Sequence, residues 1–176
     1  LYSGTNGMAG EAGHIRLAED GPVGYGKAGS FEGFCSGGGI AQLGQMMAEE
    51  ALDREEIPSF CQSKGELFKV NARTIAEAAE KGDPLALKIY DIVADRLGQG
   101  LAILVDLLNP EKIVIGSIFL RQEKLLRPRM EKILNKESLE QSLSVVEVVP
   151  AGLGEKLGDY AAVSVGLRAY QKKQKG

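Results

Sequence analysis

Three residues near the start of the chain are suited to binding chemistry: Glu11, His14 and Glu32. His14 is the only histidine present. Carboxylates accept hydrogen bonds from hydroxyl groups, and a neutral imidazole can both donate and accept them. Two acids and an imidazole therefore suit a small ligand rich in hydroxyl groups. A solvated surface loop whose acids bind nothing explains the same residues equally well.

The segment that carries these residues, 6–39, is dense in glycine and reads NGMAGEAGHIRLAEDGPVGYGKAGSFEGFCSGGG. Glycine adopts positive φ angles without the steric cost that other residues meet. We therefore expect this backbone to turn repeatedly and to shape a site. Residues 37–39 are successive glycines at the start of a helical pattern. They indicate either the close approach of a ligand or another backbone, or a flexible hinge.

Three runs of this segment occur in a distinctive order: AGEAGH at residues 9–14, VGYGKAGSFE at residues 23–32 and CSGGGIA at residues 35–41. They resemble the central signature of the ROK family, in which AGExGH is followed by CxCGxxGCLE and by a helix that opens with a small SG pair. The family comprises bacterial glucokinases, fructokinases, N-acetylhexosamine kinases and sugar-responsive repressors. The resemblance implies that Glu11, His14 and Glu32 bind sugar hydroxyl groups.

The chain departs from the family at the three cysteines that bind zinc beside the histidine. Val23, Tyr25 and Ser30 stand at those positions. A structural zinc site needs four ligands in tetrahedral geometry, mostly nitrogen or sulfur, and only His14 remains. We therefore predict that no zinc is bound. The hairpin is expected to be held by packing of Val23, Tyr25 and Phe31, and by hydrogen bonds from Ser30.

The rest of the chain alternates helical and strand patterns. Strands are predicted over residues 14–18, 112–116 and 144–149, and helices over residues 31–53, 72–81, 84–108, 118–135 and 161–171. This alternation is typical of an α/β layer fold. The resemblance implies more, namely that residues 1–176 form the C-terminal, sugar-binding lobe of an actin-like, ribonuclease H-like sugar kinase fold.

Two of the predicted helices contain residues that disturb them. Gly98 and Gly100 interrupt the apolar stripe of the longest helix, where we expect close packing against the sheet or against a second subunit. Pro128 is expected to bend or break the helix over residues 118–135. Arg127 and Arg129 in that helix indicate a solvated basic face.

A possible anion site follows the strand at residues 112–116, KIVIG. A strand, a tight turn and a helix N-terminus together present backbone N–H groups to anions. In the family, IVxGG at this place meets the nucleotide, so the resemblance places Gly116 and Ser117 at the ATP site. Ser117 stands where the family has its second glycine. Its side chain leaves less room for a phosphate or ribose to approach the backbone. A plain joint between strand and helix explains the same residues without the resemblance.

Phosphoryl transfer to a sugar needs a general base and ATP held with Mg²⁺. The family's base is the aspartate of an ND dipeptide, and its phosphate loop is DxGGT. Neither motif occurs in this chain, so we assign no catalytic residue to it. We expect both motifs upstream of Leu1, in an ATP-binding lobe that this chain lacks, and we expect the chain alone to be catalytically inert.

Two functions from different classes fit the resemblance. The first is ATP-dependent phosphorylation of a hexose or an N-acetylhexosamine. The second is a sugar-responsive repressor, in which the same pocket binds an inducer and an upstream helix-turn-helix binds DNA. A degenerate member that has lost both roles is a third possibility. Homodimerisation is implied by the resemblance in each case.

Composition is that of an ordinary globular domain. The chain has 176 residues, of which 44% are hydrophobic and 26% charged, and its net charge is −3. Nothing in this balance favours binding of this part to nucleic acid or to an anionic membrane. No apolar run approaches the roughly 20 residues that span a bilayer. The cysteines form no CxxC pair, which favours a reducing, cytoplasmic location.

Overall fold

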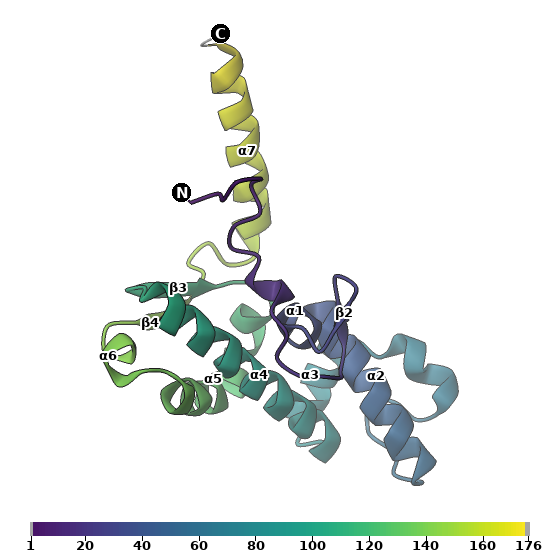
Figure 1. Cartoon of the computed structure of the whole chain (residues 1–176). Helices are drawn as coiled ribbons and strands as arrows, with labels where there is room; N and C mark the ends of the chain where they lie inside the picture. The colour runs from purple at the N-terminus through teal and green to yellow at the C-terminus, as the bar shows by residue number, and fades with distance from the viewer. Residues whose placement is uncertain (1, 175–176) are drawn as a thin grey trace.

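The structure, a computed structural model, describes residues 2–174. Helices make up most of the molecule, and two small sheets lie among them (Figure 1). The elements in chain order are η1 (Ala12–His14), β1 (Val23–Gly24), β2 (Lys27–Ala28), α1 (Phe31–Cys35), α2 (Gly37–Asp53), η2 (Lys64–Lys69), α3 (Ala72–Glu80), α4 (Pro84–Leu108), β3 (Lys112–Ile115), α5 (Ile118–Glu137), α6 (Glu140–Leu143), β4 (Glu147–Pro150), η3 (Gly154–Lys156) and α7 (Leu157–Gln174).

Helix α4 is the element against which most of the other α-helices pack. It contacts α1, α2, α3, α5 and α6. Asp83 begins the helix, because its Oδ1 accepts a hydrogen bond from the N–H of Ala86 (2.9 Å) and Pro84 needs no N–H partner at the first position. The helix ends at Asn109, which adopts the left-handed conformation. These bounds confirm the predicted helix over residues 84–108.

The buried face of α4 supplies much of the core. Its buried residues are Ala86, Ile89, Tyr90, Val93, Ala94, Leu97, Gly98, Gly100, Leu101, Ala102 and Val105. Complete burial of a side chain such as Ile89 stabilises the fold by about 1.5–3 kcal/mol. The helix therefore fixes the positions of its neighbours through apolar contact.

Strands β3 and β4 form a parallel pair whose register runs from Lys112 opposite Glu147 to Ile115 opposite Pro150. Helices α5 and α6 connect them, which gives a strand-helix-strand unit of the kind that defines α/β folds. The predicted strand at residues 144–149 is confirmed, although it begins later. The joint between β3 and α5 carries Gly116 and Ser117.

The predicted strand over residues 14–18 is wrong. The chain makes a 3-10 turn through His14, and Arg16 forms only a single antiparallel bridge with Ser30. Backbone hydrogen bonds join Ile15, Leu17 and Ala18 to residues 29–31, but they form only one β-bridge and no continuous strand.

The helix predicted over residues 31–53 is divided at Ser36, whose backbone is extended (φ −81°, ψ 158°). Two serine side chains cap the two halves. Ser30 Oγ accepts from the N–H of Gly33 (3.1 Å), and Ser36 Oγ accepts from the N–H of Gly39 (3.0 Å). A continuous helix would bond the N–H of Gly39 to the carbonyl of Cys35, whereas here Ser36 Oγ accepts it, so α2 begins separately from α1.

Helix α5 differs from its prediction in two respects. The non-helical residue is Gln122 (φ −122°, ψ 26°), whereas Pro128 lies inside the helix. Pro128 has no N–H to donate to the carbonyl one turn earlier in the helix. Because Pro128 is exposed, water can hydrate that carbonyl. Arg129 is paired with acids of α4, through Nε to Asp95 Oδ1 (2.6 Å) and one NH to Asp91 Oδ2 (3.0 Å), so the basic face is tied to a neighbouring helix.

Helix α7 projects away from the rest of the molecule, with its described side chains exposed (Figure 1). It contains the predicted helix over residues 161–171. No helix among residues 2–174 combines the length and the apolar character needed to cross a bilayer.

Gly98 was expected to allow close packing of α4 against the sheet or against a second subunit. It instead allows α4 and α5 to approach closely. A Cβ at this position would lie 2.7 Å from both Met130 O and Ile133 Cβ of α5. We expect Gly98→Ala to destabilise the fold by about 1–3 kcal/mol, because backbone atoms cannot move aside cheaply.

The measurement is urea denaturation, with Gly38→Ala as the matched control. Gly38 lies in helix α2, and a Cβ there meets nothing within 4 Å. We expect the control to be neutral or to stabilise by up to about 1 kcal/mol. Equal effects of the two substitutions would show that the helices are not in close contact at Gly98.

Candidate functional site

The short turn η1 lies between two of the predicted binding residues and against the third. Glu11 precedes η1, His14 ends it, and Glu32 lies in the first turn of α1. A Cβ placed on Gly13 would lie 3.2 Å from Glu32 Cβ and 3.7 Å from its Oε2, so the turn rests directly against the Glu32 side chain. The N–H of Phe31 also donates to the carbonyl of Ile15 (2.8 Å), which fastens α1 to the chain that follows η1.

These three side chains lie at the surface and leave their polar groups available. Glu11 and His14 are exposed, and Glu32 is half-buried. Among the side chains and backbone groups that the structure describes, none forms a hydrogen bond or ion pair with either carboxylate or with the imidazole. Two acceptors and a group that can donate or accept are therefore free to meet a ligand from solvent.

The hairpin of β1 and β2 lies beside this turn and carries the residues that replace the family's cysteines. Ser30 is fully buried, and its hydroxyl donates to the carbonyl of Gly24 (3.4 Å) while it caps α1. The hydrogen bonds expected from Ser30 are thus confirmed. The packing expected from Val23 and Tyr25 is wrong, because their exposed fractions are 47% and 89%. Val23 lies in a strand of two residues and Tyr25 in the turn that follows it, and both side chains face solvent, whereas Phe31 packs against Gly100 of α4.

The donors at the zinc-ligand positions do not fit a zinc ion. Val23 offers no ligand atom, and Tyr25 and Ser30 offer only hydroxyl oxygens. Across the described part of the chain, no group of three or more His, Cys, Asp or Glu residues could hold a metal.

Cys35 contacts the carbonyl of Val93, and burial raises the pKa of its thiol despite the nearby Arg96.

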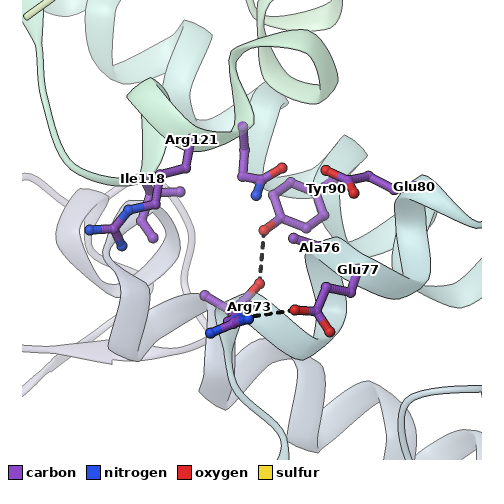
Figure 2. A pocket seen from close by; sticks show the side chains of 9 residues that line it. Arg73, Ala76, Glu77, Glu80, Tyr90, Ile118 and Arg121 are labelled. Atoms are coloured by element: carbon purple, nitrogen blue, oxygen red, sulfur yellow. Dashed lines mark hydrogen bonds and ion pairs between the residues drawn. The ribbon is translucent and has the colours of Figure 1, made fainter. Parts of the chain in front are cut away.

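A pocket of about 490 Å³ lies elsewhere, between α3, α4 and the start of α5 (Figure 2). Its lining residues are Ala72, Arg73, Ala76, Glu77, Glu80, Tyr90, Ile118, Arg121 and Gln122. The charged groups include an ion pair between Arg73 Nε and Glu77 Oε1 (2.8 Å). The sequence analysis missed this pocket, although the arginine and glutamate four residues apart indicate a common helix face.

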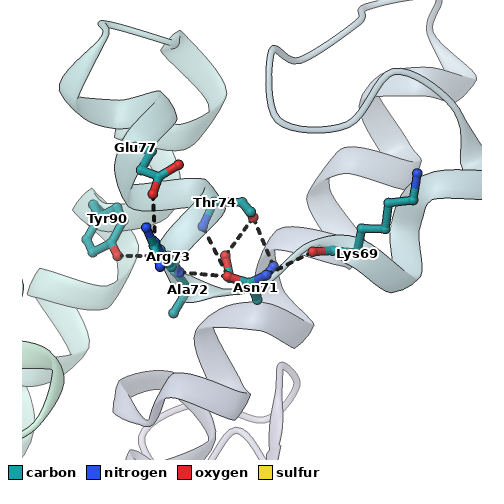
Figure 3. A network of polar contacts seen from close by, with 7 residues as sticks. All are labelled: Lys69, Asn71, Ala72, Arg73, Thr74, Glu77 and Tyr90. Carbon is teal, nitrogen blue, oxygen red and sulfur yellow. Dashed lines mark hydrogen bonds and ion pairs between the residues drawn. The ribbon is translucent and has the colours of Figure 1, made fainter.

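Local hydrogen bonds fix the walls of this pocket (Figure 3). Asn71 Oδ1 accepts from the N–H groups of Arg73 (3.0 Å) and Thr74 (3.1 Å), and Thr74 Oγ1 accepts from the N–H of Asn71 (3.1 Å). This reciprocal cap defines the first turn of α3. Tyr90 OH, on α4, donates to the carbonyl of Ala72 (3.1 Å). Burial, assisted by the charge of Glu80, raises the pKa of Tyr90 to about 12, so the phenol keeps its proton at neutral pH.

Gly116 and Ser117 directly precede Ile118 in the sequence, and Ile118 is one of the residues that line this pocket. Ser117 has φ 54° and ψ −120°, a conformation that essentially only glycine adopts without strain. No side chain caps the first N–H groups of α5. The predicted anion site is therefore a helix start with available donors and a strained residue.

This geometry can be compared with known proteins. The ROK family model matches residues 1–166, and the chain belongs to the ROK family. The chain is 30% identical over 168 residues to the DNA-binding transcriptional dual regulator NagC of Escherichia coli, which covers 93% of this chain and 39% of that protein. It is 36% identical over 131 residues to a glucokinase of Halalkalibacterium halodurans, which covers 73% of this chain and 38% of that enzyme.

Among solved structures, a ROK family glucokinase from Streptomyces griseus in complex with glucose and AMPPNP superposes with a TM-score of 0.69 and 26% identity, over 89% of this chain and 50% of that one. The α/β, actin-like sugar kinase fold predicted from the sequence is thus confirmed. The chain spans between 38% and 50% of the length of these three relatives. Since they include both kinases and a regulator, membership alone does not separate the two functions.

The strain at Ser117 can be measured. We expect Ser117→Gly to stabilise the fold by about 1 kcal/mol, because the relief of a strained backbone exceeds the added freedom of glycine in the unfolded chain. Urea denaturation measures the change.

Ser144→Gly is the control, since Ser144 has ordinary helical angles (φ −65°, ψ −15°). We expect this control to lose about 0.5–1 kcal/mol. A loss of the same size in both variants would mean that Ser117 carries no strain.

Proposed function

We propose that this chain is the sugar-binding part of an ATP-dependent kinase that phosphorylates a hexose or an N-acetylhexosamine. The observation that carries the proposal is that the turn between Glu11 and His14 lies against the Glu32 side chain, with no partner for the polar groups of these three residues among the described side chains. Sugar hydroxyl groups are donors that match two carboxylates, and they can also accept from an imidazole. The similarity to glucokinases supports this choice of ligand.

The pocket between α3, α4 and α5 is the proposed site for the nucleoside part of ATP. Its volume of about 490 Å³ lies within the range of small-molecule sites. Gly116 and Ser117 would place phosphate oxygens at the free N–H groups that begin α5. When bound, Mg²⁺ would neutralise charge on the transferred phosphoryl group. The AMPPNP in the Streptomyces griseus structure supports nucleotide binding by this fold.

The chain contributes binding and orientation in this proposal, and we assign no general base to it. Transfer to a hydroxyl group requires a base close to that hydroxyl. We place the base, and most of the phosphate contacts, in a further lobe. The glucokinases compared above are long enough to contain one, since this chain spans 38% and 50% of their lengths. Residues 1–176 alone are then expected to bind sugar weakly and to transfer no phosphate. We also propose that the complete protein is a homodimer.

A sugar-responsive repressor is the second candidate. The observation that favours it is the 30% identity to NagC over 93% of this chain. The same three side chains would then bind an inducer, and the sugar would change DNA binding. One experiment on the complete protein separates the candidates: sugar-dependent hydrolysis or transfer of the γ-phosphate supports the kinase, whereas DNA binding that glucose or N-acetylglucosamine weakens supports the repressor.

We expect Glu11→Gln and Glu32→Gln in the complete protein each to weaken sugar binding by about 1–3 kcal/mol. The reason is that a charged acceptor is lost while the shape of the side chain is kept. Affinity for ATP should not change, because Gly116 and the pocket are untouched. Calorimetric titration with glucose and with N-acetylglucosamine measures both.

The control is Glu19→Gln, an exposed acid in the same glycine-rich segment. We expect wild-type sugar affinity from it. If the two test variants also bind sugar as tightly as the wild type, the assignment of these carboxylates is wrong.

A further inference from the structure

We propose that Gln42 and Lys27 hold the hairpin of residues 23–30 in place without a metal, and that they position His14 for its ligand. The role in ligand binding rests on the function proposed above. The mechanical role does not, and it can be tested separately.

Gln42 acts as an amide clamp on the first strand. Its Oε1 accepts from the N–H of Val23 (3.0 Å), and its Nε2 donates to the carbonyl of the same residue (3.0 Å). Both backbone groups of Val23 are thus satisfied by one side chain, as a neighbouring strand would satisfy them. Gln42 lies on α2, next to the buried Leu43. The clamp therefore anchors the hairpin to a helix that is fixed in the core.

Lys27 links the second strand to the turn that carries His14. Its Nζ donates to the carbonyl of His14 (2.8 Å). A return link runs from Arg16, whose guanidinium donates to the carbonyls of Ala28 (2.9 Å) and Glu19 (3.2 Å). Two charged donors thus cross between the hairpin and the segment after η1 in opposite directions. Hydrogen bonds from charged groups are the stronger ones, so Lys27 restrains the carbonyl of His14, and Arg16 ties the segment after η1 to the hairpin.

The inner side of the hairpin leaves no room for movement toward α1. A Cβ on Gly24 would lie 2.5 Å from the backbone nitrogen of Gly33 and 2.8 Å from Ser30 Oγ. Gly33 directly follows Glu32. The hairpin, His14 and Glu32 are therefore mechanically coupled, and loss of the clamp allows both binding residues to shift.

These contacts replace what a bound metal does elsewhere in the family. A metal would join the turn of His14 to the hairpin through ligands on both. Here Val23, Tyr25 and Ser30 supply no such ligands, while Gln42 and Lys27 join the hairpin to α2 and to η1. The site should consequently be insensitive to zinc chelators.

The test uses the complete protein and two readouts. The first is hydrogen–deuterium exchange of the amides in residues 23–30 without sugar. The second is the affinity for glucose and N-acetylglucosamine compared with the affinity for ATP. Gln42→Leu should speed hairpin exchange roughly tenfold, since about 1.4 kcal/mol corresponds to a factor of ten. Lys27→Met should weaken sugar binding about fivefold or more without changing ATP affinity, and Lys27→Arg should restore it.

Gln45→Leu is the matched control for the clamp. Gln45 lies one turn further along α2, and its amide also donates to a backbone carbonyl, that of Val70 (3.2 Å), outside the hairpin. We expect hairpin exchange in this variant, and in wild-type protein treated with 1,10-phenanthroline, to match the untreated wild type.

The proposal is overturned if Gln42→Leu changes hairpin exchange no more than Gln45→Leu does, or if the chelator speeds it. The positioning role is overturned if Lys27→Met lowers sugar and ATP affinity equally, or if Lys27→Arg behaves like Lys27→Met. If the wild type binds neither sugar, the proposed function fails, while the exchange measurement still decides the role of Gln42.

Discussion

The structure depends on how closely the backbones of residues 10–39 approach one another. Gly13 lies against the Glu32 side chain, Gly24 against the amide of Gly33, and Gly39 against the carbonyl of Gly33. A Cβ at Gly24 or Gly39 would collide with backbone atoms, which cannot move aside without displacing a whole segment. The glycines therefore have a steric role: they allow η1, the hairpin and α1 to pack closely, with η1 against the Glu32 side chain.

Helix α4 transmits this arrangement to the rest of the fold. Its Gly100 accommodates the ring of Phe31, the residue directly before Glu32, and its Gly98 accommodates the backbone of α5. The same helix supplies Tyr90 to the pocket that α3 and α5 complete. The two proposed binding regions are thus built on one rigid element. Polar side chains on α2 and in the hairpin then add local restraint through hydrogen bonds to the backbones of Val23 and His14.

Most of the fold could be predicted, because the signals that define it are local. The start of α4 is indicated by Asp83 and Pro84, and the end of α3 by Gly82, which has a positive φ. The β-branched run before Gly116 indicates the strand β3. These features act over a few residues, so composition and spacing reveal them. The approach of the turn before His14 to Glu32 follows the order of the glycine-rich motifs, and a shared role for Glu11, His14 and Glu32 stays a prediction.

The errors arise where contacts between distant residues decide the outcome. Residues 14–18 alternate like a strand, but their backbone hydrogen bonds to residues 29–31 give only a single β-bridge, at Arg16 and Ser30. Val23 and Tyr25 are exposed because Gln42, from another element, holds the hairpin by its backbone. The pocket lined by Arg73, Glu77 and Tyr90 forms where three helices pack together. No short sequence pattern indicates which helices will be neighbours.

The central claim is that the acids and the imidazole beside η1 bind a carbohydrate together, and His14 allows it to be observed directly. In the complete protein, the imidazole signals of His14 can be identified in a proton–carbon correlation spectrum by their loss in His14→Gln. The account predicts that saturating glucose or N-acetylglucosamine shifts these signals in the wild type, and that the shift is lost or much reduced in Glu32→Gln. Sugar binding that leaves the His14 signals unmoved would contradict it.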